Sequence, residues 1–380
     1  MRSKQTIKII MNYSYWELKE WFTNIDFTIV GSGIVGLNCA LALKKKYPKA
    51  NVLILEKGML PQGASTKNAG FACFGSLSEL IDDLKTHTEQ EVFNLVDKRW
   101  KGLQLLRQNL GDQNIDFQQN KGFELCENEP FFEECISKKA QINQLLKSIF
   151  NADVFSETTN VFGFQNIYKT YITNNFEGQI DTGKMVAQLL LKVQSLGVKI
   201  LNNIELQSYQ EKVGEIELKT NRSDFYTNKL CIATNGFASQ LVQQNLQPAR
   251  AQVFITKPIK NLKIKGTFHL DKGYYYFRNI DHRILFGGGR NLDFKTEETA
   301  EFGQTTIIQN ELERILKETI LPNINFEIEH RWSGIMGVGN QKKAIVKQLS
   351  NNVFCGVRLG GMGVAIGSLV GEELAELVIN

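Results

Sequence analysis

The sequence contains few of the residues that bind metals or cross-link small folds. Its 380 residues include four histidines and six cysteines, the latter at positions 39, 73, 126, 135, 231 and 355. No CxxC pair occurs and no cysteine–histidine cluster has zinc spacing, so the sequence predicts no metal site. Unpaired cysteines are typical of a reducing compartment, where disulfides are rare, and we therefore expect a cytoplasmic protein.

Long apolar runs and blocks of one charge are also missing. The most apolar stretch, residues 353–379, is interrupted by Arg358 and several glutamates, which excludes a membrane span. Residues 1–10 lack the apolar core and cleavage site of a secretory signal, and translation could start at Met1 or at Met11. The formal net charge of +4 is too small and too evenly spread to indicate a nucleic-acid partner.

What remains is the composition of an ordinary globular protein. Hydrophobic residues make up 42% of the chain and charged residues 22%. A chain of 380 residues is too long for a single typical core, so the length favours two domains.

The first informative motif is a glycine-rich turn between a strand and a helix. Residues 26–30 form an apolar strand-like run, and residues 34–46 have the pattern of a helix. The turn between them reads Gly31, Ser32, Gly33, Ile34, Val35, Gly36. In such a turn the first glycine permits the tight bend, the second lets a pyrophosphate approach, and the third lets the helix pack on the strand. The free N–H groups of the helix then face the phosphates.

An acidic residue completes this motif. A second strand, residues 52–55, ends at Glu56 and Lys57, about 20 residues beyond the turn, where a carboxylate can accept both ribose hydroxyls. The context predicts a dinucleotide site. It does not distinguish FAD from NAD.

A second glycine-rich segment selects between them. It follows Glu56 closely and consists of Gly63, Ala64, Ser65, Thr66, Lys67, Asn68, Ala69 and Gly70. This segment resembles the flavin-facing loop of the D-amino-acid-oxidase-like FAD family, which includes glycine, sarcosine and amine oxidases. The resemblance implies that the loop and the helix after it lie along the pyrophosphate and isoalloxazine of FAD.

Two later segments strengthen the resemblance. A strand at residues 229–232 ends in Ala233, Thr234 and Asn235, similar to the family's motif near the adenosine, and the resemblance places Leu206 beside the adenine. Near the C-terminus another glycine-rich turn precedes a helix and comprises Arg358, Leu359, Gly360, Gly361, Met362, Gly363 and Val364. Glycines there let the backbone approach the flavin, and a helix N-terminus stabilises negative charge on the reduced ring.

These segments predict an α/β fold with a discontinuous Rossmann-like FAD-binding domain, built from residues 26–109, 176–247 and 332–380. Residues 110–175 and 248–331 are expected to form an inserted substrate domain of the α+β class with a mixed sheet. Residues 1–25 are expected to form an N-terminal helical extension.

The substrate domain contains strand-like runs at residues 252–256, 274–278 and 283–287. The last two flank a tight turn, residues 279–282, in which we expect His282 to be exposed with positive φ. Alternation places Tyr274 and Tyr276 on one face of their strand. The resemblance implies that this sheet covers the flavin, with Tyr274, Tyr276 and Trp332 around the substrate, although ordinary core aromatics would give the same pattern.

The sequence departs from the family pattern at two positions. Met336 stands about where glycine-oxidase-like members carry an arginine that grips the substrate carboxylate. An amine, or an acid held instead by Arg278 or Arg290, is therefore expected. Leu285 stands where sarcosine-oxidase-like members carry a lysine near the reactive face, which leaves the acceptor open between O2 and another oxidant.

Three further residues receive structural interpretations. Cys355 lies too close to the C-terminal glycine motif to match the cysteine that binds flavin covalently in some relatives, so we expect non-covalent FAD. His269 and His330 are the histidines worth testing for catalysis, and we expect both to be structural.

The resemblance implies an FAD-dependent oxidoreductase that oxidises the C–N bond of an amine or amino acid. Hydride passes to flavin N5 and the imine is hydrolysed in water. Two alternatives stay open: a 2-hydroxy-acid dehydrogenase on the same fold, which needs a carboxylate clamp and a base, and a non-catalytic flavoprotein, whose flavin no metabolite reduces.

Overall fold

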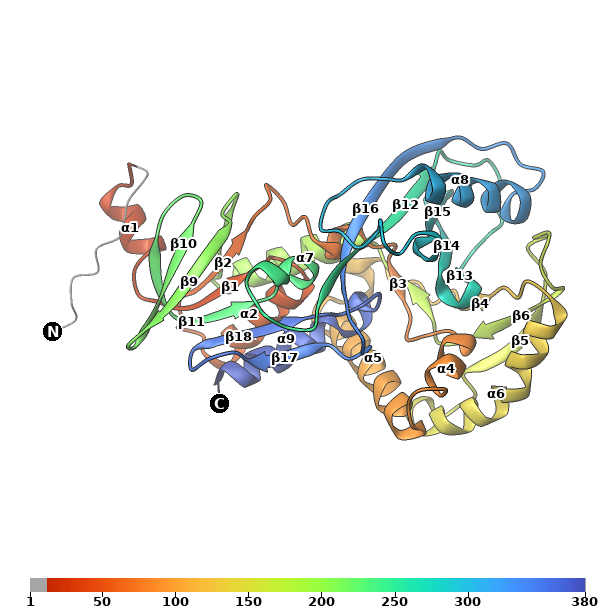
Figure 1. Ribbon diagram of the computed structural model, residues 1–380, viewed down its shortest axis with the longest axis horizontal. Coiled ribbons are helices and arrows are strands. Elements are labelled where there is room, and N and C mark those ends of the chain that lie inside the picture. The colour runs from red at the N-terminus through yellow and green to blue at the C-terminus, as the bar shows by residue number, and fades with distance from the viewer. Residues whose placement is uncertain (1–11, 380) are drawn as a thin grey trace.

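The computed structural model describes residues 12–379, so the choice between Met1 and Met11 lies outside the described residues. Two large sheets occupy opposite halves of an elongated molecule (Figure 1). Within the predicted N-terminal extension, α1 (Tyr15–Trp21) is a short helix with a capping box between Ser14 and Glu17. It lies at the outer edge of the first half, away from the second sheet.

The first sheet has eight strands, and its centre is parallel. The order is β17 (Ile345–Gln348), β18 (Val353–Val357), β11 (Phe225–Ile232), β1 (Ile25–Val30), β2 (Val52–Glu56) and β8 (Lys199–Asn202). Strand β10 (Glu215–Thr220) also pairs with β11, and β9 (Leu206–Lys212) pairs with β10. Strands β8, β2, β1, β11 and β18 run parallel. Every residue of β2 and β18 is buried, as expected for parallel strands covered on both faces.

Small residues allow two helices to cross closely over this sheet. Helix α9 (Gly363–Ile379) packs on α2 (Ile34–Lys46). A Cβ added at Gly371 would lie 2.6 Å from Cβ of Asn38, and one added at Gly367 would lie 2.5 Å from Cγ2 of Ile34. The C-terminal helix therefore approaches the first glycine-rich turn because glycine faces α2. Helix α7 (Thr182–Ser195) also packs against α2.

The second sheet also has eight strands and is antiparallel except between β13 and β4. Its order is β16 (Ile328–Val338), β12 (Gln247–Thr256), β15 (Arg283–Gly288), β14 (Tyr275–Ile280), β13 (Thr267–Leu270), β4 (Gly122–Glu124), β6 (Thr170–Asn174) and β5 (Phe155–Thr159). One face packs on α8 (Thr306–Ile315) through a core that includes Phe254, Phe277 and Phe286, all completely buried. The other face is turned toward the cofactor loop.

Helices complete the second half. Helix α5 (Glu89–Leu110) packs on α9, and α6 (Glu129–Phe150) packs on α4 (Leu77–Asp83). The short helix α3 (Ala64–Lys67) and the small strand pair β3 (Phe71–Ala72) and β7 (Gly178–Gln179) lie between the two large sheets. The glycine-rich loop of residues 63–70 is thus placed where the two halves meet.

The predicted fold class is confirmed, and the hairpin turn has the expected conformation. Asp281 and His282 have φ of 46° and 59°, and both side chains are exposed. Tyr274 lies just before β14 instead of within it. The predicted boundary between residues 331 and 332 falls inside β16, which pairs with β12 on both sides of it.

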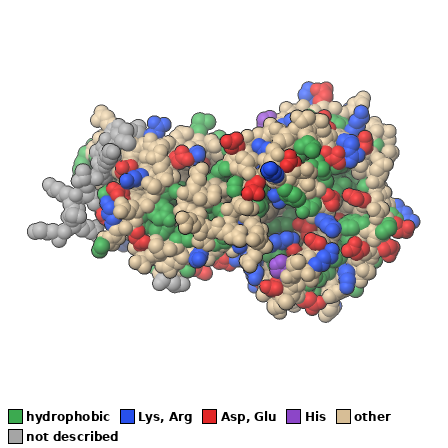
Figure 2. All heavy atoms as spheres, viewed as in Figure 1, with side chains coloured by type: hydrophobic (Ala, Val, Ile, Leu, Met, Phe, Trp, Pro, Cys, Tyr) green, Lys and Arg blue, Asp and Glu red, His purple; other side chains and the backbone are tan. Residues whose placement is uncertain are grey.

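Among residues 12–379, no helix is long and apolar enough to cross a membrane. Figure 2 shows acidic and basic side chains interspersed over the second half of the molecule.

Candidate active site

A cavity of about 990 Å³ runs from the first glycine-rich turn to the underside of the second sheet. It receives residues from β1, β2, α3, β12, β14, β16, the segment that follows β11 and the N-terminus of α9. This volume is at the upper end of the range for small-molecule and cofactor sites, about 300–1,000 Å³. A ligand of dinucleotide size could therefore extend across both halves.

The first turn is built as the sequence predicts. Gly31 has φ of 102°, which favours glycine, and Gly36 leaves no room for a Cβ beside the Gly31 carbonyl and Ile29. The backbone N–H of Ile34, at the start of α2, donates to Oγ of Ser65 at 2.9 Å. The helix N-terminus and the second glycine-rich segment are therefore joined at the point where a phosphate would approach.

Glu56 lies at the end of β2 and is buried. Its Oε2 accepts from the backbone N–H of Ser32 at 3.1 Å and from the Ser32 hydroxyl at 2.6 Å, and its Oε1 accepts from the N–H of Gly58 at 3.0 Å. Ser32 is completely buried and does not line the cavity, so its role is to orient the Glu56 carboxylate. Glu56 itself lines the cavity.

The far side of this end is formed by residues that follow β11 and by the start of β9. Ala233, Thr234, Asn235 and Leu206 line the cavity as expected. The Thr234 hydroxyl is buried and has no hydrogen-bond partner within residues 12–379. An orphaned buried hydroxyl beside a cavity indicates a ligand that completes its hydrogen bonding. At the outer edge, Lys57 pairs with Glu205 at 2.6 Å.

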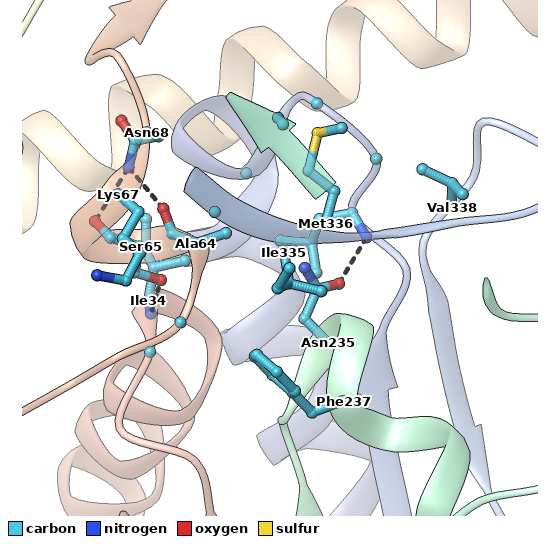
Figure 3. Close-up of a pocket in the computed structure, with 18 of the residues that line it drawn as sticks. Ile34, Ala64, Ser65, Lys67, Asn68, Asn235, Phe237, Ile335, Met336 and Val338 are labelled. Atoms are coloured by element: carbon cyan, nitrogen blue, oxygen red, sulfur yellow. Dashed lines mark hydrogen bonds between the residues drawn. The ribbon is translucent and has the colours of Figure 1, made fainter. Parts of the chain in front are cut away.

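The loop of residues 63–70 forms the middle wall. The Asn68 amide donates to the carbonyls of Ala64 and Ser65, both at 3.0 Å, and its oxygen accepts from the N–H of Gly70 at 2.8 Å. Figure 3 shows Ser65, Lys67 and Asn68 on this wall, with Ile335, Met336 and Val338 on the strand opposite. Met336 brings no charge to the cavity, as the sequence indicates.

Two expected substrate contacts hold this loop instead. Trp332 Nε1 donates to the Lys67 carbonyl at 2.9 Å. The Arg278 guanidinium donates to the carbonyls of Ala69 and Ile180, the latter at 3.0 Å. Neither side chain lines the cavity, and burial lowers the pKa of Arg278 to about 10. We therefore reassign Trp332 and Arg278 from substrate contacts to supports that fix the loop backbone.

The C-terminal glycine turn forms the opposite wall. Arg358, at φ of 62°, donates to the carbonyls of Lys343 at 3.1 Å and Asn245 at 2.9 Å, so it anchors the turn without lining the cavity. A Cβ added at Gly360 or Gly361 would meet nothing within 4 Å. The turn therefore borders open space and carries the N-terminus of α9 to the cavity, with Met362, Gly363 and Val364 among its lining residues.

These features fit FAD. The first turn and α2 would hold the pyrophosphate, Glu56 the ribose, and Thr234 and Leu206 the adenosine end. The residue 63–70 loop and the α9 N-terminus would enclose the isoalloxazine. Of the predicted cofactor residues, those that line the cavity are Gly31, Gly33, Ile34, Val35, Glu56, Lys57, Gly63, Ala64, Ser65, Lys67, Asn68, Ala69, Gly70, Leu206, Ala233, Thr234, Asn235, Gly360, Gly361, Met362, Gly363 and Val364. Ser32, Gly36 and Arg358 support them from behind.

The roof of the cavity is one row of residues across the second sheet. Val253, Gly287, Tyr276 and His269 are direct partners on β12, β15, β14 and β13. Directly opposed residues project to the same face, so these side chains point together. Val253, Tyr276 and His269 line the cavity, and burial raises the pKa of the Tyr276 phenol to about 12, which keeps it neutral.

Cationic and aromatic groups lie at the far end of the roof. Tyr274 and Arg290 line the cavity, and the Arg290 guanidinium lies 4.7 Å from the centre of the Phe294 ring. Burial lowers the pKa of Arg290, and no hydrogen bond or ion pair engages its guanidinium within the described chain. The Lys67 ammonium lies 5.2 Å from the centre of the Phe302 ring at the cavity edge.

Several residues that line the cavity belong to none of the sequence motifs described above. Phe71 and Cys73 directly follow the residue 63–70 loop, and that adjacency could have indicated them. Glu79 belongs to the capping box of α4, a pattern that predicts a helix start and no site. His269 lines the cavity, whereas His330 is exposed on β16 and lies outside it. The sequence does not indicate that His269 lines the cavity, because the position of this residue depends on the pairing of β13 with β14, and no local pattern predicts that pairing.

Comparisons with known proteins agree with this geometry. Residues 26–377 match a family model described as FAD dependent oxidoreductase. A protein of Haemophilus influenzae named "Probable oxidoreductase OrdL" is 21% identical, with 93% of this chain and 83% of that protein covered. A glycine oxidase from Geobacillus kaustophilus has a similar structure, with a TM-score of 0.75, 19% identity, and coverage of 93% of this chain and 94% of that chain. An L-proline dehydrogenase from P. horikoshii has a TM-score of 0.71 and 19% identity, with 93% of this chain and 92% of that chain covered.

Proposed function

We propose that this chain, which belongs to the family of FAD-dependent oxidoreductases, oxidises the C–N bond of an amine or amino acid. The reaction would yield an imine that water hydrolyses. FAD supplies the hydride-accepting N5 atom when it is bound. The chain supplies the position of the substrate, the exclusion of water and the charges around it.

The continuous cavity is the observation that carries this proposal. It connects the dinucleotide motif directly to the roof formed by Val253, Tyr276 and His269. The roof therefore encloses space next to the loop expected to face the flavin, where a small substrate can be held near contact distance. Such positioning can lower a reaction barrier by about 7–11 kcal/mol at best.

Arg290 is proposed to hold a carboxylate when the substrate carries one. It is the arginine among the candidates that lines the cavity, since Arg278 is committed to the backbone and position 336 is a methionine. Its guanidinium forms no ion pair within residues 12–379, although Tyr274, Glu297 and Glu298 are near enough to raise its pKa against the effect of burial. Substrates that carry a carboxylate would then depend on Arg290, and amines without a carboxylate would not.

FAD is proposed to bind non-covalently. Cys355 is buried in β18 and lies outside the cavity, whereas Cys73 lines it. Burial raises the pKa of the Cys73 thiol well above its usual range, so this group stays a poorly nucleophilic thiol. Acid precipitation should leave a colourless pellet and a yellow supernatant; a yellow pellet would contradict the proposal. All six cysteines are free and buried, which supports the proposed cytoplasmic location.

An anaerobic titration of the FAD-loaded protein tests the proposed reaction. The panel comprises D- and L-amino acids, glycine, sarcosine, polyamines, glutamylated amines and 2-hydroxy acids, and the readout is loss of the yellow absorption. We expect bleaching by an amine or amino acid. Bleaching by 2-hydroxy acids alone would support the dehydrogenase alternative, and no bleaching by any compound would favour a non-catalytic flavoprotein.

Admission of air after bleaching identifies the acceptor. Rapid return of the yellow colour with formation of peroxide would indicate O2, and slow return would indicate another acceptor.

The matched variant Arg290→Met should weaken reduction by substrates with a carboxylate and leave reduction by simple amines unchanged.

A further inference from the structure

A buried imidazole–carboxylate pair lies in the roof of the cavity. Nε2 of His269 is 2.6 Å from Oε1 of Glu177, and the Thr267 hydroxyl donates to the same oxygen at 2.8 Å. Glu177 is completely buried and His269 is 6% exposed. A buried ion pair contributes little net stability compared with apolar residues of similar size, so a pair whose imidazole lines a cavity is a candidate for a functional role; here His269 lines the cavity and Glu177 does not.

The fold makes space for this pair. A Cβ added at Gly122 on β4 would lie 3.0 Å from Cβ of Glu177 and closer still to its carboxylate, so only glycine admits the Glu177 side chain there. Glu177 Oε2 has no hydrogen-bond partner within the described residues. The carboxylate is thus committed to His269 and Thr267 and is shielded from water.

His269 lines the cavity, and its other ring nitrogen is not engaged within the described residues. Nε2 is engaged by Glu177, whereas no hydrogen bond engages Nδ1 within residues 12–379. The ring lies beside Phe71, with centroids 5.3 Å apart, and Phe71 also contacts Tyr276 at 5.6 Å. The imidazole is therefore held in one orientation, by Glu177 on one side and by aromatic rings on another. A base that a second group orients in this way is the arrangement required for proton transfer.

The carboxylates around His269 favour the binding of a cationic substrate. Glu79, on α4, lines the cavity, and Glu124, the partner of His269 across β13 and β4, accepts hydrogen bonds from Ser76 and Ser78. Burial opposes the charge of His269, but the Glu177 carboxylate outweighs it, with smaller contributions from Glu79 and Glu124, and raises the pKa of His269 to about 9. Burial also raises the pKa of Glu124. Tyr276 is the other polar neighbour, and because its pKa is raised to about 12 the phenol stays neutral at lower pH.

We propose that His269, oriented by Glu177, is the proton acceptor of this active site and receives the proton of the substrate's ammonium group at Nδ1. This inference rests on the proposed oxidation of a C–N bond. The N–H bond of the ammonium breaks, the proton passes to neutral His269, and the nitrogen keeps the electron pair. The imidazolium that forms is stabilised by Glu177. His269 is then a catalytic residue and Glu177 a positioning residue.

Proton linkage follows directly from this assignment. An alkylammonium group has a pKa of about 10.4, and below pH 9 both it and His269 are protonated in their free states. In the complex the substrate nitrogen and Nδ1 of His269 share one proton, because two cations within hydrogen-bonding distance would repel each other. Binding therefore releases one proton below pH 9, and the dissociation constant should fall about tenfold for each unit of rising pH.

tert-Butylamine is the probe for this linkage, because it carries no hydrogen on the carbon next to nitrogen and cannot be oxidised by hydride loss. Its dissociation constant for the FAD-loaded protein is measured between pH 6.5 and 9 from the change in flavin absorption. tert-Butanol has the same shape without a proton to release, and its affinity should not change with pH. We expect the tenfold dependence in wild type and a flat profile in His269→Gln.

The exposed turn residue supplies the control variant, since His282→Asn replaces a histidine outside the cavity and should keep the wild-type profile. A flat wild-type profile, an unchanged slope in His269→Gln, or no binding of tert-butylamine at pH 9 would each overturn the proposal.

Imidazole NMR provides a readout that needs no substrate. The chain has four histidines, so the resonance of His269 can be assigned from its loss in His269→Gln. Its midpoint should lie near pH 9 and should fall markedly in Glu177→Gln, which keeps a hydrogen-bond acceptor but removes the charge. A midpoint near that of a solvated histidine would contradict the proposal. If no amine bleaches the flavin but the NMR midpoint and the linked binding are as expected, the proposed reaction fails while the proton-accepting pair stands.

Discussion

The two ends of the cavity are built by different means. The nucleotide end is formed largely by backbone, through glycine turns, helix N-termini and a single carboxylate at a strand end. The substrate end is formed by side chains that several strands bring together, such as Val253, Tyr276 and His269. Backbone sites require particular residue types at fixed spacing, whereas side-chain sites depend on which strands are neighbours.

This contrast explains what the sequence could predict. Gly31, Gly36 and Glu56 are separated by spacings that only a strand–turn–helix unit explains, so the first site was readable along the chain. His269 and Glu177 are 92 residues apart, and their contact depends on the pairing of β13 with β4 and on the loop before β7. No local pattern carries that information, because strand order is a property of the whole sheet.

The corrections at the substrate end have the same origin. The resemblance predicts that Arg278 and Trp332 meet the substrate, because it places their strands over the flavin. The direction of each side chain from its strand and the position of the residue 63–70 loop decide instead that both donate to carbonyls of that loop. Alternation along a strand indicates a shared face, but it does not indicate what that face meets.

Substitution of Gly36 should have the largest effect, since it tests the backbone-built end. A Cβ at this position would collide with the Gly31 carbonyl and would lie 3.2 Å from Cγ2 of Ile29. We expect Gly36→Ala to destabilise the protein by about 3 kcal/mol and to abolish FAD binding, because the turn cannot close on the helix. Thermal unfolding and the yellow colour of the purified protein measure the two effects.

Gly63→Ala is the matched control for that substitution. A Cβ at Gly63 would meet nothing within 4 Å, and φ there is −71°, so the fold should be unaffected. Any loss of FAD in this variant would then report on the open space beside residue 63. Normal stability and colour in Gly36→Ala would contradict the view that backbone approach builds this end.

Arg278→Met should have an intermediate effect, because it removes a side chain that joins the two ends. The carbonyls of Ala69 and Ile180 would lose their donor in a buried position, at about 1–3 kcal/mol for each group. We expect a lower urea midpoint and weaker FAD binding, measured by fluorescence of the released flavin. Arg283→Met, which removes a half-buried arginine paired with the exposed Glu329 at 2.8 Å, should change both quantities much less. Equal effects of the two variants would show that Arg278 does not support the loop.

The smallest effect is expected at His282. At this one turn the substrate end depends on backbone conformation, as the nucleotide end does throughout. His282 has φ of 59° in the turn between β14 and β15, the turn that sets the register of Tyr276 against Gly287. Glycine and asparagine accept positive φ, whereas a β-branched residue does not. We expect His282→Gly to leave the urea midpoint almost unchanged and His282→Val to cost about 1 kcal/mol, because valine must be forced into this conformation. The side chain is exposed, so no packing change competes with this explanation. Equal stability of the valine and glycine variants would mean that strand pairing alone sets the register. The substrate end would then not depend on the backbone conformation of this turn, and the two ends of the cavity would be built by entirely different means.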